Sequence, residues 1–167
     1  MLPAQLQGRQ VHLVREPEAD ARAQAYVQEV LAGFTQSRYT MHFQSDDPLQ
    51  GLELLEALRR GEIVAIQGDR PRTGARSIEA TLFGRTFPLP PGPAALARIA
   101  DVPLLPVFVF REGRRRYRVV FRPPIRVTRT DDRAADLAAT MRQVAGEVEW
   151  AIRRAPHQWF CFKRLWP

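Results

Sequence analysis

One histidine is followed by a carboxylate at a spacing that can support base catalysis. His42 lies five positions before Asp47, a His-x4-Asp arrangement. A histidine of this kind can take the proton of a hydroxyl group, while the carboxylate orients the ring and stabilises its charge. The spacing also arises by chance. The alternative, which the residues alone favour, is that Asp46 or Asp47 caps a helix and His42 is an ordinary strand residue.

A second candidate site follows a short apolar strand, Ile63–Ile66. Asp69 and Arg70 come directly after it. In open α/β sheets, ligands bind beyond the carboxyl ends of strands. We therefore expect this acid and base either to bind a polar group or to pair with each other in a turn, where an exposed ion pair adds little stability.

A third candidate is the start of a helix after a proline-rich stretch. Gly92, Pro93 and Ala94 follow Pro90 and Pro91. Proline fixes the approach of the chain, and a helix N-terminus offers free backbone N–H groups to an anion. The alternative is an ordinary helix start with no ligand.

The sequence contains no recognisable metal or nucleotide motif. One cysteine and three dispersed histidines do not make a metal-ligand spacing, and no Gly-x-Gly loop is present. His12 and His157 are isolated in sequence, so we expect each to be a packed core or surface residue.

Alternating strands and helices must position these residues. We expect strands over residues Gln10–Val14, Tyr39–Phe43, Ile63–Ile66, Ser77–Leu82, Leu104–Phe110 and Tyr117–Phe121. We expect helices over Ala19–Ala32 with Gly33 as its cap, from Pro48 to Arg59, over Ala94–Ala100, and from Asp131–Asp132 through Ile152. This order predicts an α/β fold. A hairpin turning at Glu112–Gly113 makes the sheet mixed, flanked by helices.

Length and charge restrict the class of protein. The 167 residues fit one domain, and the longest apolar run is too short to span a bilayer. The net charge is +7, and 24 of the 25 basic residues are arginine. Such a surface attracts nucleic acid, acidic lipid headgroups or an acidic carrier protein. Arg114–Arg116 and Arg118 are expected in a solvated turn. No nucleic-acid partner is expected, because the arginines do not interleave with exposed aromatic residues.

Five segments, taken in order, resemble one family. They are Leu58–Arg70, Leu82–Arg85, Phe87–Ala97, Pro103–Phe108 and Arg154–Phe160. Their order and spacing are similar to the C-terminal half of the bacterial lipid A biosynthesis acyltransferases, the lauroyl and myristoyl transferases. The likeness covers most of the chain, from about Val11 to Trp166.

The resemblance implies a fold like the C-terminal part of the glycerolipid and lipid A acyltransferases. It implies transfer of a fatty acyl group from acyl carrier protein, or another acyl thioester, to a hydroxyl of a glycolipid such as a lipid A precursor. It also implies a location at the cytoplasmic face of the bacterial inner membrane, peripheral in this chain and on an anionic membrane surface. No metal or redox cofactor is implied.

The resemblance also suggests roles for residues outside the histidine motif. Asp69 matches the acid that follows a strand in the family, and Arg70 matches the arginine after it. They would order the site and meet a phosphate. Gly92, Pro93 and Ala94 match the loop and helix start that shape the acyl or headgroup site.

The chain departs from the family at the catalytic dyad. In the family the dyad precedes a strand like Val11–Val14, whereas this chain begins just before that strand. We therefore expect residues 1–167 to be a single, partial domain without the upstream catalytic half. His42 and Asp47 have the spacing of the dyad at a different position. Three hypotheses follow: an acyltransferase that could be inactive alone, a non-catalytic lipid- or partner-binding remnant of the fold, and, least favoured, a nucleic-acid-binding domain.

Overall fold

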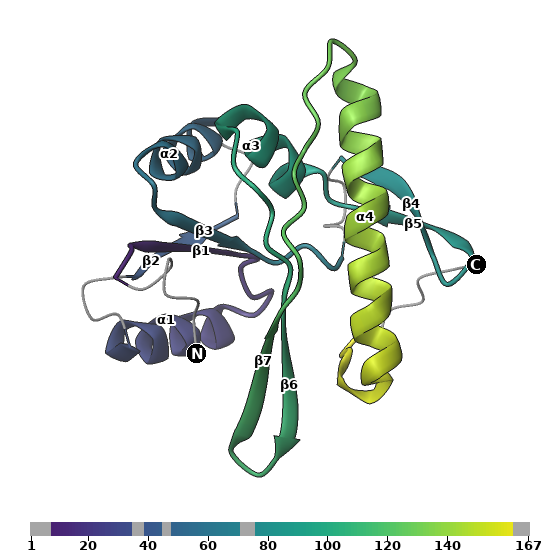
Figure 1. Ribbon diagram of the computed structural model, residues 1–167. Helices are drawn as coiled ribbons and strands as arrows, with labels where there is room; N and C mark the ends of the chain where they lie inside the picture. Colours follow the sequence, from purple (N-terminus) through teal and green to yellow (C-terminus); the bar gives the residue numbers. More distant parts are fainter. Residues whose placement is uncertain (1–7, 35–38, 45–47, 71–75, 162–167) are drawn as a thin grey trace. The chain divides into compact units, whose positions relative to one another are not determined.

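A computed structural model of the chain describes residues 8–34, 39–44, 48–70 and 76–161 (Figure 1). Side chains are described over the same residues except 31–34 and 48. The chain forms two compact units, residues 1–67 and residues 68–167. In the described residues, parallel strands form a sheet in the first unit, and antiparallel pairs form two sheets in the second. The predicted α/β class is confirmed.

The first unit is a three-stranded parallel sheet with connecting helices. The elements are β1 (Val11–Arg15), α1 (Ala21–Phe34), β2 (Tyr39–Phe43), α2 (Pro48–Arg59) and β3 (Ile63–Ile66). The strand order is β2-β1-β3, so β1 pairs on both sides. Gly33, predicted to cap the first helix, instead lies inside its last turn, because Phe34 continues the helical spacing of Tyr26 and Val30.

The second unit begins with a hairpin of β4 (Ile78–Leu82) and β5 (Arg85–Leu89). Phe83 and Gly84 both have positive φ, 53° and 73°, as a two-residue hairpin turn with the twist of its strands requires. β5 was not among the strands expected from the sequence, where it overlaps a proline-rich stretch. Pro88 is compatible with the strand because β5 pairs only with β4 in the described part of the chain, and an edge strand can do without one N–H.

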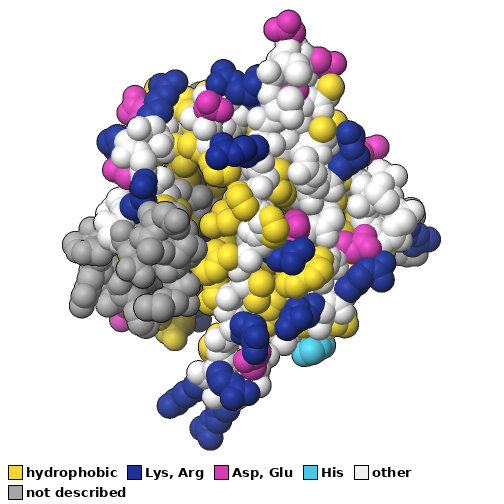
Figure 2. Space-filling model, in the orientation of Figure 1, with side chains coloured by type: hydrophobic (Ala, Val, Ile, Leu, Met, Phe, Trp, Pro, Cys, Tyr) yellow, Lys and Arg dark blue, Asp and Glu magenta, His cyan; other side chains and the backbone are white. Residues whose placement is uncertain are grey.

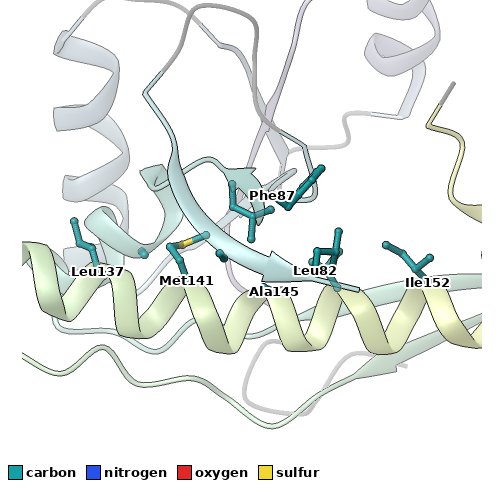
Figure 3. Close-up of a cluster of buried hydrophobic side chains, with 10 residues drawn as sticks. Leu82, Phe87, Leu137, Met141, Ala145 and Ile152 are labelled. Atoms are coloured by element: carbon teal, nitrogen blue, oxygen red, sulfur yellow. The ribbon is translucent and has the colours of Figure 1, made fainter. Parts of the chain in front are cut away.

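A long helix provides the core of this unit. The helix α3 (Gly92–Ala100) follows the first hairpin. After a second hairpin come the long helix α4 (Arg133–Arg154) and a short 3-10 turn, η2 (Pro156–Gln158). One face of α4 packs against β4 and β5 at helical spacing (Figure 3). The buried side chains of this core include Leu82, Phe87, Leu137, Met141, Ala145 and Ile152.

A second hairpin, β6 (Val107–Gly113) and β7 (Arg116–Phe121), forms a long two-stranded ribbon (Figure 1). One face packs on α4, where Phe110 contacts the ring of Trp150. The turn lies at Arg114 and Arg115, so the predicted turn at Glu112–Gly113 is wrong. Gly113 pairs with Arg116 across the strands, after a bulge that follows Arg111.

The predicted strand Leu104–Phe110 begins later than expected. Leu104 forms only an isolated bridge with Ile125, and the continuous strand starts at Val107. Pro106 separates the two, because a proline cannot donate a ladder hydrogen bond.

The N-terminus of α4 is held by two aspartates. Asp132 caps it, accepting a hydrogen bond from the Ala135 N–H at 2.9 Å, as predicted for the Asp131–Asp132 pair. Asp136, in the first turn, is buried and accepts hydrogen bonds from the backbone and hydroxyl of Thr130 and from Arg98. Burial alone raises the pKa of Asp136, but the hydrogen bonds from Thr130 and Arg98 outweigh it and lower the pKa.

We predict that Asp136→Asn lowers the free energy of unfolding at neutral pH. Because the pKa of Asp136 is lower in the folded protein than in the unfolded chain, its carboxylate stabilises the fold above the ordinary pKa of about 4. That contribution is lost as the pH falls through the folded pKa. Urea unfolding from pH 7 to pH 3 should therefore show wild type and variant converging in acid. The control is Asp131→Asn, an exposed neighbour; a constant gap between Asp136→Asn and wild type across this range would contradict the prediction.

Candidate functional site

A chain of hydrogen-bonded side chains crosses the parallel sheet of the first unit. His12 Nδ1 on β1 lies 2.9 Å from His42 Nε2 on β2, and His12 Nε2 lies 2.8 Å from Glu62 Oε2, just before β3. Strand register explains the grouping. Val14 pairs with His42 and His12 pairs with Val64, so the three side chains project diagonally from one face of the sheet.

Glu62 is the anionic end of this chain. Arg60 donates to both carboxylate oxygens, Nε to Oε1 and Nη2 to Oε2, each at 2.9 Å. The hydrogen bond from Arg60, followed by that from His12, lowers the pKa of Glu62 to about 2. Glu62 is therefore a carboxylate throughout the physiological range and accepts hydrogen bonds only.

His42 is the other end of the chain, and its environment favours the neutral ring. Burial, followed by the neighbouring charge of His12, lowers the pKa of His42, and Glu53 opposes both. The Nδ1 atom of His42 lies 3.9 Å from Glu53 Oε2, beyond hydrogen-bond distance. In the residues that the structure describes, no group hydrogen-bonds this nitrogen. A neutral histidine with an open ring nitrogen can act as a base.

Only part of the prediction made for the histidine motif falls within the described residues. His42 is a strand residue, as the alternative predicted, while Asp47 lies outside the described residues and its pairing with His42 stays a prediction. His12, expected as a packed core or surface residue, is buried and hydrogen-bonded to His42 and Glu62. His12, Glu62 and Arg60 were not recognised as a group, because they are distant in sequence and only the register of parallel strands brings them together.

The acid and base after β3 form a second cluster, within residues 68–167. Arg70 Nε pairs with Asp69 Oδ2 at 3.1 Å, and the indole Nε1 of Trp159 donates to the same oxygen at 3.1 Å. Trp159 also packs edge-on against Phe87 of the core. The pairing predicted as an alternative is therefore present. Binding of a substrate by Asp69 and Arg70 stays a prediction.

The third predicted site lies at the start of α3. Gly92, Pro93 and Ala94 form its first turn, and the residue before them, Pro91, makes no side-chain capping hydrogen bond. Ala94 is fully buried. A Cβ added to Gly68 would lie 3.8 Å from the Pro93 ring, which brings the segment after β3 beside the start of α3. Anion binding here stays a prediction.

In the described part of the chain, no group of three or more histidine, cysteine or acidic side chains is arranged to hold a metal ion. None of the helices described has both the length and the apolar character needed to cross a membrane.

Together, the parallel sheet with its histidine chain and the helix-backed hairpins define an α/β protein with a candidate acid–base site. Residues 18–167 match the model of the bacterial lipid A biosynthesis acyltransferase family. The chain belongs to this family, which confirms the resemblance, and its general function is of the lipid A acyltransferase type. A search of curated proteins found no match.

The Asp69–Trp159 hydrogen bond predicts a measurable contribution to stability. Asp69→Ala leaves the indole N–H of Trp159 without this acceptor, so the free energy of unfolding should fall by about 1 kcal/mol. Asp69→Asn keeps an acceptor oxygen, so its free energy of unfolding should fall less. Urea unfolding followed by circular dichroism measures both. The control is Glu79→Ala, which removes an exposed carboxylate of β4; equal effects of Asp69→Ala and Glu79→Ala would refute the assignment.

Proposed function

We propose that this protein transfers a fatty acyl group from acyl carrier protein, or another acyl thioester, to a hydroxyl of a glycolipid such as a lipid A precursor. The observation that carries the proposal is the family match over residues 18–167. The hydrogen-bonded chain of His42, His12 and an ionised Glu62 supports it, because acyl transfer to a hydroxyl needs a base.

In this proposal, His42 Nδ1 takes the proton of the acceptor hydroxyl as the hydroxyl oxygen attacks the thioester carbonyl. A carbon–oxygen bond forms and the carbon–sulfur bond breaks. The leaving thiolate of the carrier then receives the proton from His42, so the base is regenerated. No redox step is needed.

Asp69 and Arg70 supply the proposed acceptor contacts. The Arg70 guanidinium is partly exposed beside Asp69, and a guanidinium binds a phosphate through paired hydrogen bonds. Gly92, Pro93 and Ala94 would shape the adjacent acyl or headgroup site through the uncapped start of α3. These roles follow the family resemblance.

We also propose peripheral attachment to the anionic cytoplasmic face of the inner membrane, through the β6–β7 hairpin. Five arginines and one glutamate lie between Arg111 and Arg118. Figure 2 shows cationic side chains gathered at the free end of this hairpin. One face of the ribbon also exposes apolar side chains, those of Val107, Val109, Tyr117 and Val119. Basic and apolar groups side by side suit the headgroup region of a bilayer.

A second candidate function is non-catalytic binding of a lipid or a partner protein. The exposed apolar face of the hairpin favours it, because a binding surface needs no base. The two functions differ in their dependence on His42.

We predict that His42→Ala lowers the rate of acyl transfer from acyl carrier protein by at least about 100-fold, the usual contribution of a general base. Transfer of a radiolabelled acyl chain to a lipid A precursor measures it. His157→Ala, which removes an exposed histidine of the second unit, is the matched control and should keep the wild-type rate. Equal rates for His42→Ala and wild type would remove His42 from the mechanism and favour the binding function.

The hairpin arginines should dominate binding to anionic vesicles. Replacing Arg114, Arg115 and Arg116 by glutamine should weaken binding by roughly 1 kcal/mol for each residue. Sedimentation with vesicles of phosphatidylglycerol and phosphatidylethanolamine measures it. A control variant replaces Arg129, Arg133 and Arg142, which are exposed outside the hairpin, by glutamine and has the same net charge. If both triple variants lose the same affinity, the attraction belongs to the whole surface and the hairpin assignment fails.

A further inference from the structure

The Glu62 carboxylate determines which atom donates and which accepts in each hydrogen bond of the histidine chain. Glu62 is ionised and can only accept, so His12 Nε2 must carry the hydrogen in the 2.8 Å contact with Glu62 Oε2. The other nitrogen of a neutral His12, Nδ1, is then an acceptor. In the 2.9 Å contact between the rings, when both rings are neutral, the donor is therefore His42 Nε2.

This direction specifies the tautomer of His42. With its hydrogen on Nε2, a neutral His42 has its lone pair on Nδ1, the nitrogen that no described residue hydrogen-bonds. The opposite tautomers would turn the Nε2 lone pair of His12 toward the Glu62 carboxylate at 2.8 Å, which is repulsive.

We propose that Glu62 and His12 are positioning residues that hold His42 as the Nε2–H tautomer, so that Nδ1 is the basic atom. The proposal rests on the proposed acyl transfer, and it adds that the carboxylate that orients His42 is Glu62, acting through a second histidine. This group differs from a direct pair of His42 with Asp47 in its residues and in the ring nitrogen through which it acts.

The same chain can carry the charge that forms during the reaction. When Nδ1 of His42 takes a proton, the ring becomes a cation whose Nε2–H already points at His12 Nδ1. Transfer of that proton breaks the N–H bond on His42 and forms one on His12. The positive charge then lies 2.8 Å from Glu62, instead of on a ring whose Nδ1 is 3.9 Å from the mostly exposed Glu53.

Of the charged groups around the rings, Glu62 favours this direction and Glu53 opposes it. Glu62 faces His12 from the segment before β3, and Arg60 holds that carboxylate. Glu53 on α2 faces His42 at 3.9 Å, and His12 on β1 is its hydrogen-bond partner. Glu53 is mostly exposed, so solvent screens its effect on the choice of tautomer.

Glu62→Gln provides the test, because an amide can donate as well as accept. A glutamine N–H can donate to His12 Nε2. His12 then carries its hydrogen on Nδ1 and donates to His42 Nε2, which moves the hydrogen of His42 to Nδ1. Nitrogen NMR of the ¹⁵N-histidine-labelled protein reads the tautomer at a pH where both His12 and His42 are neutral.

We expect wild-type His42 to be protonated on Nε2 alone, and Glu62→Gln to gain the Nδ1–H form. In acyl transfer, kcat should fall by at least about tenfold while KM for the acceptor stays within about twofold. Glu62→Asp, which keeps a carboxylate at this position, should keep the wild-type tautomer. Arg60→Gln removes the partner of Glu62 but keeps the carboxylate, so it should also keep that tautomer. Glu56→Gln, exposed on α2, is the surface control.

Two results would overturn the proposal: a wild-type His42 that carries its hydrogen on Nδ1, or a Glu62→Gln variant that changes the tautomer without changing kcat. The first needs no variant, so it applies even if Glu62→Gln does not fold. The tautomer is measured without substrate, so the position of the hydrogen on His42 is established independently of catalysis. A wild type with the expected tautomer and no acyl transfer would overturn the proposed function and, with it, the catalytic role of this chain.

Discussion

A buried histidine in the middle strand of a parallel sheet must find partners for two ring nitrogens, because an unpaired polar group away from water is costly. His12 finds one partner on each side, His42 from β2 and Glu62 from the segment before β3. A slip of one residue in either neighbouring strand would turn these partners to the opposite face. The side chains that can do chemistry are thus also the ones that specify the register of this sheet.

In the second unit, carboxylates near the ends of helices and strands must likewise find hydrogen-bond partners. Asp136 is buried in the first turn of α4 and is satisfied by Arg98 and Thr130. Asp69, after β3, accepts from Trp159 beyond the end of α4. In both cases one carboxylate joins segments that are distant in sequence, so buried or half-buried acids help to position the segments around the apolar core of α4.

Sequence patterns predicted the α/β class, the family and most elements, because helical and strand periodicity are local properties. They failed where the structure of one segment depends on its pairing with another segment. The strand β5 was missed because Pro88 is unfavourable in a central strand but acceptable at an edge. The turn of the second hairpin was displaced because a bulge changed its register. The link from His12 to Glu62 spans 50 residues and depends on strand pairing, which no local pattern contains.

An acidic carrier protein and an anionic membrane would use the features of the β6–β7 hairpin differently. An acidic carrier protein and an anionic membrane both attract the arginines between Arg111 and Arg118, and salt screens both attractions. A bilayer also buries the apolar face that contains Val109 and Tyr117, and this gain does not depend on ionic strength. Charge alone therefore suits transient capture of a donor that must leave after each transfer, whereas charge together with the apolar face suits the lasting contact that a lipid acceptor requires.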